Sequence, residues 1–416
     1  MRILQVAHYF LPRHLGGVEN YTYNLAKELQ KQHEVYVYCR EDGYFNKDYY
    51  EVNEIYEGLF LKRIFYNKRR TLEDTYNNRL IDERFADFLD RLKPEVIHFQ
   101  HLERLSVGMI NMARKKGIPS VLTLHDYWFI CPLIQLLIQY ETPCPLEYSP
   151  ERCLNCINTW AQRNQVVFYP KQDANTMLNI VNRRKEVMRE VLNKVDAIIA
   201  PSLFLKKKHL ESGLTSNIEY FDYGINLKEF SVLNRSHERG ISFGFIGSIM
   251  KHKGLHILVD AFKRLKSSDV KLKIFGKGYD TYFAGVIKSS MKDERIEYKG
   301  HFRNSKLTEI LSQIDILVVP SLWYENSPFV IHEAFAARIP VIASDIGGIS
   351  EKVHDGKNGL LFDPHKENDL FEKLSLIEQN RHWIGKMSYN IRPIKSIEQN
   401  ASELTGIYGT SMINGK

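Results

Sequence analysis

The chain has 416 residues, of which 44% are hydrophobic and 26% charged, and its formal net charge at pH 7 is +7. These fractions exclude a disordered or fibrous chain, and the length predicts two domains of roughly 200 residues each. No run reaches the roughly 18 apolar residues of a membrane-spanning helix, and the first ten residues do not lead into a cleavage site, so we expect a cytoplasmic protein. The positive charge favours anionic partners, such as phosphorylated ligands or acidic lipid headgroups.

The first predicted element is a buried strand over residues 2–9, and a helix follows it from Gly17. The turn between them holds Gly16 and Gly17. Without a Cβ, such a turn lets backbone N–H groups approach a phosphate closely. Both glycines are therefore candidate phosphate-binding residues, although a Gly-Gly pair alone is more often a plain turn.

Strands and helices then alternate through the first half of the chain. We predict strands at 33–40, 95–101, 120–126 and 196–202, and helices at about 82–92, 104–116 and 184–194. This alternation indicates a doubly wound α/β domain, whose ligands lie at the carboxyl ends of its strands. His125 ends one of these strands and is a candidate site residue, although a histidine in that place is more often structural.

A long connection of about residues 129–175 follows His125. It holds four of the five cysteines: Cys131, Cys144, Cys153 and Cys156. Their number suits a tetrahedral thiolate site, although their spacing fits no standard zinc finger closely. We expect either a structural metal, with zinc ahead of an iron–sulfur cluster, or four unliganded thiols packed as small hydrophobic groups. Disulfides are not expected in a reducing cytoplasm.

Basic and aromatic side chains mix over residues 58–70, GLFLKRIFYNKRR. We expect either a solvated face or a contact with an anionic membrane surface, which would place the protein peripherally at the inner face of the membrane. Further along, residues 231–239 are polar and aperiodic and predict a linker. The predicted domains are therefore 1–230 and 240–385, with closing helices in 386–416.

In the second half of the chain a buried strand is predicted over residues 315–320, which are nearly all apolar and β-branched. Asn326 and Ser327 are favoured N-cap residues and Pro328 suits a first helical position, so we predict a helix from there to about Arg338. The unpaired N–H groups at its start would form a seat for a phosphate.

Glu325 and Glu333 frame this predicted helix start. Glu325 lies just before the helix and Glu333 about a turn and a half inside it. A carboxylate is a natural acceptor for two neighbouring sugar hydroxyls. Either glutamate alone would more simply be read as a charge that complements the helix dipole.

Together these residues carry a resemblance. Glu325 and Glu333 have seven residues between them and are followed by AARIPVIASDIGG, a combination that resembles the retaining family-4 glycosyltransferases of the GT-B fold. Three further segments support it: HYFLPRHLGGVEN, NIEYFDYGINLKEF and GSIMKHKGLHILVDAF. The resemblance covers almost the whole chain, except the cysteine-rich connection. Tyr223, Asn226, Ser248 and Arg338 depart from the family pattern, which has Asn, Asp, Arg and Gly there.

The resemblance implies a fold and a set of site residues. The expected fold is α/β, with two Rossmann-like doubly wound domains that face a cleft and a C-terminal helix that crosses back to the first domain. The transferred sugar would be held by Glu325 and the backbone of Asn326, Ser327, Pro328 and Phe329, and the ribose by Glu333. The donor phosphates would meet Gly16, Gly17, Lys253 and the position of Ser248, with Lys251 or His252 substituting in part for the missing arginine. His125 would lie near the reacting carbon.

The function implied is a retaining glycosyltransferase that moves a hexose from a UDP- or GDP-sugar to a hydroxyl of a glycan or lipid-linked acceptor. Family habit suggests synthesis of lipopolysaccharide, capsule or exopolysaccharide, with no metal at the donor, and the chain has no Asp-x-Asp pair to chelate one. The main alternative is a non-catalytic scaffold or lipid-surface protein of the same fold. An oxidoreductase is disfavoured because no G-x-G-x-x-G follows the first strand, and nucleic acid is not an expected partner.

Overall fold

The computed structural model describes residues 1–43, 48–66, 71–138, 142–164, 166–168, 171–230, 240–278 and 281–414. The chain divides into two compact units: unit 1 is Met1–Gly224 with Ser396–Lys416, and unit 2 is Ile225–Lys395. The first change of unit precedes the predicted linker 231–239, which lies outside the described residues. The second comes at Ser396, so of the predicted closing segment 386–416 only the last helix joins unit 1.

Unit 1 is built on an eight-stranded sheet in the order β10-β9-β6-β5-β1-β2-β4-β3. Its strands are parallel except for the antiparallel edge strand β3. The strands are β1 (Arg2–Ala7), β2 (Glu34–Asp42), β3 (Tyr50–Tyr56), β4 (Leu59–Tyr66), β5 (Val96–Phe99), β6 (Ser120–Thr123), β9 (Ala197–Ala200) and β10 (Glu219–Tyr220). The four strands predicted between residues 33 and 202 are confirmed as β2, β5, β6 and β9.

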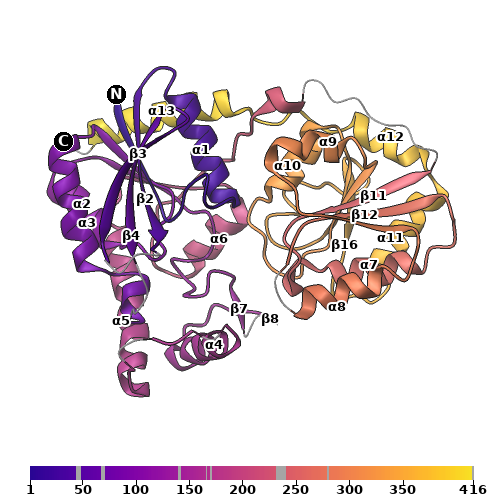
Figure 1. Ribbon diagram of the computed structural model, residues 1–416, viewed down its shortest axis with the longest axis horizontal. Coiled ribbons are helices and arrows are strands. Elements are labelled where there is room, and N and C mark those ends of the chain that lie inside the picture. Colours follow the sequence, from indigo (N-terminus) through magenta and orange to yellow (C-terminus); the bar gives the residue numbers. More distant parts are fainter. Residues whose placement is uncertain are drawn as a thin grey trace. The chain divides into compact units, whose positions relative to one another are not determined.

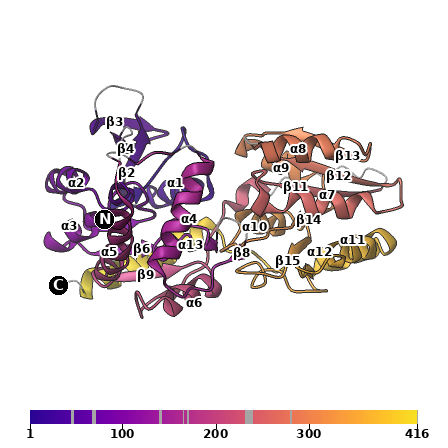
Figure 2. The ribbon, with the colours of Figure 1, turned by 90° about the horizontal axis from the view of Figure 1, so that it is seen from below.

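Helices accompany this sheet, and a small hairpin leaves it after β6 (Figures 1 and 2). The helices are α1 (Gly17–Leu29), α2 (Arg79–Leu92), α3 (Gly108–Lys115), α4 (Pro150–Arg163), α5 (Ala174–Leu192), α6 (Leu203–Glu211) and α13 (Ile397–Asn414), and the hairpin is β7 (Leu137–Ile138) with β8 (Thr142–Pro143). The C-terminal helix α13 packs on α1, so the end of the chain belongs to the first unit, as Figure 1 shows.

The three helices predicted in this half of the chain have different starts. Helix α2 begins three residues early, at Arg79, where the Asn78 side chain accepts the N–H of Ile81 as an N-cap. Helix α3 begins four residues later than the predicted start at residue 104, because Arg104 has φ +59°, a left-handed conformation that no helix can include. Helix α5 begins earlier, at Ala174, where the Asp173 side chain accepts the N–H of Thr176 as an N-cap.

The basic stretch at residues 58–70 is a sheet strand over most of its length. Lys62 and Arg63 lie on β4 and are 8% and 0% exposed. The adjacent strand β3 supplies their partners, with Lys62 Nζ 2.7 Å from Glu51 Oε2 and an Arg63 nitrogen 2.6 Å from Glu54 Oε1. Neither alternative predicted for this stretch, a solvated face or a membrane contact, holds for these two residues, since cross-strand pairing buries them. Residues 67–70 lie outside the described residues.

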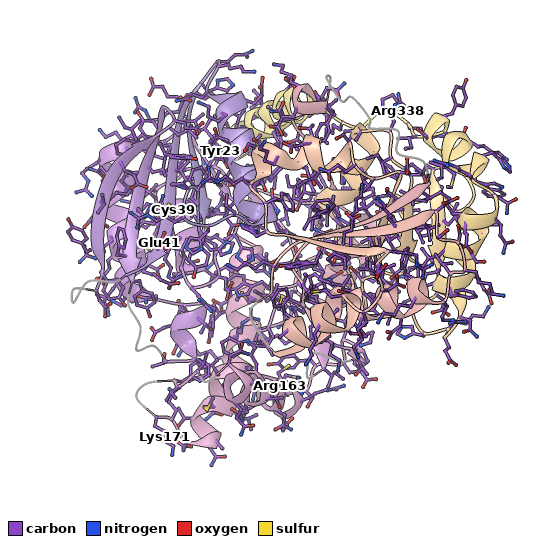
Figure 3. All side chains as sticks on the ribbon, turned by 45° about the vertical axis from the view of Figure 1, so that its right-hand side comes forward. Tyr23, Cys39, Glu41, Arg163, Lys171 and Arg338 are labelled. Carbon is purple, nitrogen blue, oxygen red and sulfur yellow. The ribbon has the colours of Figure 1, made fainter. Side chains whose placement is uncertain are left out.

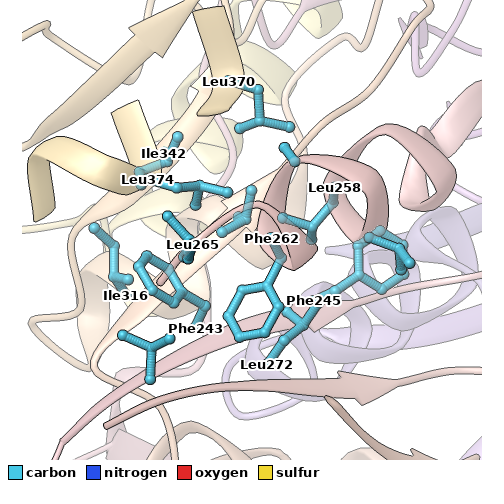
Figure 4. Close-up of a cluster of buried hydrophobic side chains, with 14 of the residues drawn as sticks. Phe243, Phe245, Leu258, Phe262, Leu265, Leu272, Ile316, Ile342, Leu370 and Leu374 are labelled. Carbon is cyan, nitrogen blue, oxygen red and sulfur yellow. The ribbon is translucent and has the colours of Figure 1, made fainter. Parts of the chain in front are cut away.

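Unit 2 has a six-stranded parallel sheet in the order β13-β12-β11-β14-β15-β16. Its strands are β11 (Ile241–Ile246), β12 (Val270–Phe275), β13 (Ile296–Gly300), β14 (Ile316–Val319), β15 (Val341–Ser344) and β16 (Gly359–Phe362). Its helices are α7 (Leu255–Lys263), α8 (Thr281–Ser290), α9 (Leu307–Leu311), α10 (Phe329–Ala336), α11 (Asp369–Gln379) and α12 (His382–Tyr389). One core cluster joins Phe243 and Ile316 of the sheet to Phe262 of α7 and Leu374 of α11 (Figure 4).

Each sheet has a point at which the strand order reverses. In unit 1 this point lies between β1 and β5, and in unit 2 between β11 and β14. In open α/β sheets ligands bind outside the carboxyl ends of the strands at such a point. The loops after these four strands are therefore where the topology places a binding site. No helix in the described parts of the chain is long and apolar enough to cross a membrane.

Candidate functional site

The site in unit 2 is formed by the loops that follow β11 and β14. After β11 the chain passes through Ser248 to a 3-10 turn, Lys251–Lys253, and into α7. After β14 it passes through Ser321 and Glu325 to α10. The N–H of Leu322 donates to the carbonyl of His252 at 2.7 Å and so joins the two loops directly.

Lys253, which is half-buried, and Glu325, which is buried, form an ion pair across these loops. Lys253 Nζ lies 2.5 Å from Glu325 Oε1, and the two side chains are 25% and 9% exposed. The same Glu325 oxygen accepts the Ser321 hydroxyl at 2.8 Å. The ammonium also lies 5.1 Å from the centroid of the Trp323 ring, within the range of a cation–π contact. The two loops thus bring together a cation, Lys253, and a hydrogen-bond acceptor, Glu325, that are 72 residues apart in sequence.

The charge state of Glu325 follows from this pairing. Burial by itself raises the pKa of the carboxyl, but the charge and hydrogen bond of Lys253, together with Ser321, hold that pKa below its ordinary value. Glu325 is therefore ionised at neutral pH and can accept hydrogen bonds.

Two glycines allow the loops to approach each other. Gly254 has φ +72°, and a Cβ there would stand 1.8 Å from the carbonyl oxygen of Pro320. Gly347 has φ +63°, and its Cβ would lie 2.7 Å from the carbonyl oxygen of Glu325, which accepts the N–H of Gly348 at 2.7 Å. A side chain at either position would push the Glu325 loop out of place.

Helix α10 begins one or two residues later than the sequence suggests. Pro328 is its N-cap, with φ −64° and ψ 119°, and Phe329 is the first helical residue. Asn326 and Ser327, which we expected as caps, are buried in the loop before it. The Ser327 hydroxyl instead lies 2.8 Å from Nε2 of His332. This contact fixes the loop against the first turns of the helix.

Glu333 lies in the middle of α10. Burial, followed by the charge of Glu229, raises the pKa of its carboxyl to about 7. A perturbed carboxyl in a loop and helix assembly of this kind is a mark of a functional site. Near neutral pH Glu333 is divided between its protonated and ionised forms.

Ser248, which stands where the family pattern has an arginine, is exposed. Ser248 lies in the loop after β11 and contributes no charge there. The expectation that His252 supplies part of that charge is wrong, because burial and the neighbouring Lys253 lower the pKa of His252 to about 4, so it is neutral. Lys251 is exposed and remains a candidate for this role.

Arg338, labelled in Figure 3, ends the segment after α10 in a left-handed conformation with φ +57°. This conformation explains why glycine is usual at the position. Here the side chain compensates: an Arg338 guanidinium nitrogen donates to the carbonyl of Ile391, and the hydroxyl of Ser388 donates to the Arg338 carbonyl at 2.7 Å. Arg338 therefore ties α10 to the end of α12.

Replacing Arg338 tests this account. Arg338→Ala loses the bond to Ile391 and keeps the strained backbone, whereas Arg338→Gly loses the same bond and relieves the strain. We expect the glycine variant to be about 1 kcal/mol more stable than the alanine variant, the reverse of the order at ordinary helix positions. Urea unfolding of both variants measures the difference, and an alanine variant equal to or more stable than the glycine variant would contradict it.

In unit 1 polar side chains gather at the carboxyl ends of β1, β5 and β6. His8 follows β1 and His101 follows β5, and their ring centroids are 4.3 Å apart. His101 Nε2 lies 3.1 Å from Oδ2 of Asp126, which follows β6, and His8 Nε2 lies 3.5 Å from Glu19 of α1. Burial lowers the pKa of His101, but Asp126 outweighs it, so that the pKa is raised overall. The cluster offers both charge signs to a polar ligand.

The predicted glycine loop meets this cluster. Gly16 is the N-cap of α1 and Gly17 its first residue. A Cβ on Gly16 would stand 2.3 Å from a carboxylate oxygen of Glu19. Burial raises the pKa of Glu19, while the backbone N–H groups of Glu19 and Gly16 oppose that rise. The carboxylate of Glu19 thus occupies the start of α1 in a capping arrangement, and a phosphate at Gly16 and Gly17 would have to displace it.

His125 lies in a buried hydrogen-bonded network. Its Nδ1 lies 2.6 Å from the hydroxyl of Tyr223 and its Nε2 lies 2.8 Å from Oε1 of Gln100. Burial lowers the pKa of His125 to about 3, so the ring is neutral. Since the Gln100 oxygen can only accept, Nε2 carries the proton and Nδ1 accepts from Tyr223. The network positions the imidazole through both of its nitrogens.

Sequence reasoning missed the residues that support these side chains. Tyr223, which stands where asparagine is usual, also stacks on His125 with ring planes 11° apart. Ser321 and Trp323 hold the Lys253–Glu325 pair. The departure at Tyr223 was a visible signal, whereas nothing in SLWYEN distinguishes a supporting serine or tryptophan from ordinary loop residues.

Two groups of side chains are candidate metal ligands. Ligand atoms of His8, His101 and Glu103 lie within 4.8 Å of one another. However, Nδ1 of His101 accepts the N–H of Glu103 at 3.2 Å and Nε2 is engaged with Asp126, so that ring has no lone pair free for a cation. The second group is the four cysteines near α4, all of which are free and half-buried.

Two Rossmann-like units, each with polar residues at the point of strand reversal, define the GT-B class of glycosyltransferase folds. A family model for Glycosyltransferase Family 4 matches residues 15–229, and one for Glycosyl transferases group 1 matches residues 229–393. The chain belongs to glycosyltransferase family 4, and the fold class expected from the sequence is confirmed.

Relatives are similar over most of the chain. An uncharacterized 42.6 kDa protein in the cps region of Klebsiella pneumoniae is 24% identical over 369 residues, which are 84% of this chain and 87% of the relative. Alpha-D-kanosaminyltransferase of Streptomyces kanamyceticus is 22% identical over 71% of this chain and 72% of that protein.

Solved structures show the same fold. HepE of Anabaena, in complex with UDP, has a TM-score of 0.71 at 15% identity and covers 99% of this chain and 100% of its own. Sucrose-phosphate synthase of Thermosynechococcus elongatus has a TM-score of 0.70 at 19% identity, with 99% of both chains covered.

Proposed function

We propose that this glycosyltransferase moves a hexose from a nucleoside diphosphate sugar to an acceptor hydroxyl and retains the anomeric configuration. The Lys253–Glu325 pair carries the proposal, because it places a cation and an ionised carboxylate together at the strand reversal of unit 2. HepE, which has the same fold, was crystallised with UDP and with UDP-glucose, which supports a nucleotide sugar as donor.

In this function Lys253 changes partners. Without donor, Glu325 neutralises it. With donor, Lys253 would turn to the diphosphate, whose negative charge grows as the bond to the sugar breaks, and Glu325 would accept hydroxyls of the sugar. The acceptor hydroxyl would attack on the face that the diphosphate leaves, and a phosphate oxygen would take its proton. Lys251 and the N-terminal end of α10 would supply further positive potential without a metal ion.

We infer a glycan or lipid-linked acceptor in the synthesis of a surface polysaccharide. The relative encoded in the cps region of Klebsiella pneumoniae supports this pathway. The polar cluster of His8, Glu19, His101 and Asp126 is where the topology of unit 1 would place such an acceptor. The alternative, a non-catalytic protein of the same fold, would leave the ion pair without a donor to bind.

A thermal-shift screen tests the proposal. The purified protein is heated with UDP, GDP, ADP and their common sugar conjugates, because a ligand present at 100 times its Kd adds about 2.7 kcal/mol of stability. We expect a shift with one nucleotide and its sugars, followed by release of the nucleoside diphosphate when acceptor is added. Folded protein that shifts with none of them would favour the non-catalytic alternative.

A further inference from the structure

Four thiols from three chain segments lie in one part of unit 1, outside the site described above. The N–H of Cys144 donates to the carbonyl of Leu136 at 2.8 Å, and Cys153 packs against the same small core as Leu133, two residues after Cys131. Cys131 lies in the turns after β6, Cys144 directly follows β8, and Cys153 and Cys156 lie on α4. The last two are three residues apart and so share one face of the helix. We call these four residues the cysteine cluster. Figure 1 shows the hairpin β7–β8, which Cys144 follows, and the helix α4, which carries Cys153 and Cys156.

Cys153 is the centre of this cluster. Burial, together with the charges of Cys131, Cys144 and Cys156, raises the pKa of its thiol to about 12. The fifth cysteine, Cys39 on β2, is fully buried among other neighbours and belongs to no such group. A set of four thiols is the ligand count of a tetrahedral zinc site.

A buried cation stands beside the cluster. The guanidinium of Arg184, on α5, is 6% exposed and donates to the carbonyls of Trp128 and Phe129. No carboxylate in the described parts of the chain forms a salt bridge with it, although a buried charge ordinarily needs an opposite one. Burial lowers the pKa of Arg184, and Cys131, Tyr76 and Cys153 act against that. As metal-bound thiolates, the two cysteines would supply the opposite charge.

The backbone around the cluster is shaped for thiolates. Burial raises the pKa of the Cys131 thiol to about 11, and the N–H groups of Leu133 and Leu136 act against that rise. Ile134 and Leu136 have φ +71° and +53°, and Leu146, two residues after Cys144, has φ +67°. For a β-branched residue such as Ile134 this conformation is costly and persists only where other interactions impose it.

The hydrophobic support of this region is small. The core between α4 and α5 has four buried residues, Leu72, Leu154, Ile157 and Val181. A core of this size rarely holds strained loops by itself, and small elements are commonly stabilised by a metal.

We propose that the cysteine cluster binds one structural zinc ion through its four sulfurs. Zn²⁺ would replace the four thiol protons, which pass to solvent, and the resulting site would carry two negative charges, of which Arg184 offsets one. No three sulfurs in the described residues lie within 4.8 Å of one another, whereas zinc–sulfur bonds of about 2.3 Å require sulfurs about 3.7 Å apart. Binding would therefore draw the hairpin and α4 together.

Such a site would also fix a cavity. A cavity of about 260 Å³ in unit 1 is lined by Pro132, next to Cys131, by Leu146 and Tyr148, which follow Cys144, and by Arg184 and Lys185. Zinc would hold one wall of this cavity against α5.

Metal analysis of the full-length chain, purified without chelators or a histidine tag, tests the proposal first. We expect about one zinc per chain, released by a mercurial that blocks thiols, and four sulfur neighbours at about 2.3 Å in X-ray absorption. Iron with acid-labile sulfide, an intact mass lowered by disulfide formation, or less than about 0.1 metal per chain would each overturn it.

Variants assign the ligands. Cys131→Ser, Cys144→Ser, Cys153→Ser and Cys156→Ser should each lower zinc content at least fivefold, while Cys39→Ala, the matched control, should keep it. Hydrogen exchange in residues 150–163 should quicken at least tenfold when zinc is removed from the wild type, which remains informative if a variant fails to fold. Zinc retained in all four serine variants would overturn the proposal, and neither readout depends on transferase activity.

Discussion

Replacing Lys253 with methionine is expected to destabilise unit 2 by about 3–5 kcal/mol, the usual cost of removing one partner of a buried ion pair. The Glu325 side chain is only 9% exposed and depends on Lys253 for its charge. Methionine keeps most of the length of the side chain and its packing near Trp323, so the change removes mainly charge. Transfer should also fall at least about a hundredfold, because the diphosphate loses a cation where its charge develops.

The contribution of Glu325 to the pH dependence of stability should have opposite signs in the wild type and in Lys253→Met. In the wild type the folded-state pKa is lowered below 4.5, so this group stabilises the fold above that pH and loses its contribution as the pH falls. In Lys253→Met the largest opposing cause is lost and only the hydrogen bonds of Ser321 and Trp323 still act against burial, so we expect the native carboxyl to hold its proton more tightly than the unfolded chain does. Stability should then decrease as the pH rises above about 4.5.

Hydrogen exchange of residues 241–246 and 316–319, measured at pH 5 and pH 8, follows both effects in unit 2 alone. Lys299→Met is the matched control, since Lys299 pairs with Glu297 at 2.7 Å with a side chain that is 40% exposed. It should cost less than about 1 kcal/mol. The double variant Lys253→Met/Glu325→Gln should regain stability but not transfer. A loss for Lys253→Met as small as that of the control would contradict the buried pair.

Replacing Glu333 with glutamine is expected to weaken binding of the nucleotide sugar about tenfold to a hundredfold. If the ionised carboxylate accepts both ribose hydroxyls, the loss corresponds to about 1.5–3 kcal/mol for hydrogen bonds to a charged group. Glutamine keeps the volume of the side chain, so the fold should be little affected. Calorimetry with the nucleotide sugar that gives the largest thermal shift measures the change, and an affinity within about threefold of the wild type would remove Glu333 from the site.

The pH dependence of binding provides a second test of Glu333. Because its pKa is raised to about 7, the ionised fraction should grow about tenfold between pH 6 and pH 8, and affinity should grow with it. A nucleotide sugar is the proper probe, since its phosphates do not titrate in this range. Glu229→Gln removes a charge that raises this pKa, so it should move the midpoint to lower pH, and Glu333→Gln should abolish the dependence. Affinity that is independent of pH in the wild type would contradict the assignment.

The same raised pKa affects the stability of the protein without ligand. Native Glu333 binds its proton more tightly than the unfolded chain does, so its contribution to stability declines as the pH rises from 4.5 to about 7. Bound donor would offset this cost by hydrogen bonds to the carboxylate. The protein without ligand is thus less stable when Glu333 is ionised, which is the form that would bind the donor.

By itself the sequence determined the family, the two-domain α/β class and the residues of the site motif. Local patterns are sufficient for this, because buried parallel strands are read from apolar runs and the Glu325–Glu333 spacing is preserved in one segment. The first helix is found at Gly17, where it was predicted, and α10 was placed to within two residues at its start.

Only the tertiary structure decided how these residues are charged and held. Lys253 and Glu325 pair because two strands, β11 and β14, are neighbours in the sheet, and burial there leaves His252 neutral and Glu333 half-ionised. Likewise Arg63 is buried because β3 pairs with β4, and Arg184 reaches the carbonyls of Trp128 and Phe129 from a helix, α5, that packs on α4. These outcomes depend on contacts between residues distant in sequence and on removal from water, which no local pattern of residues encodes.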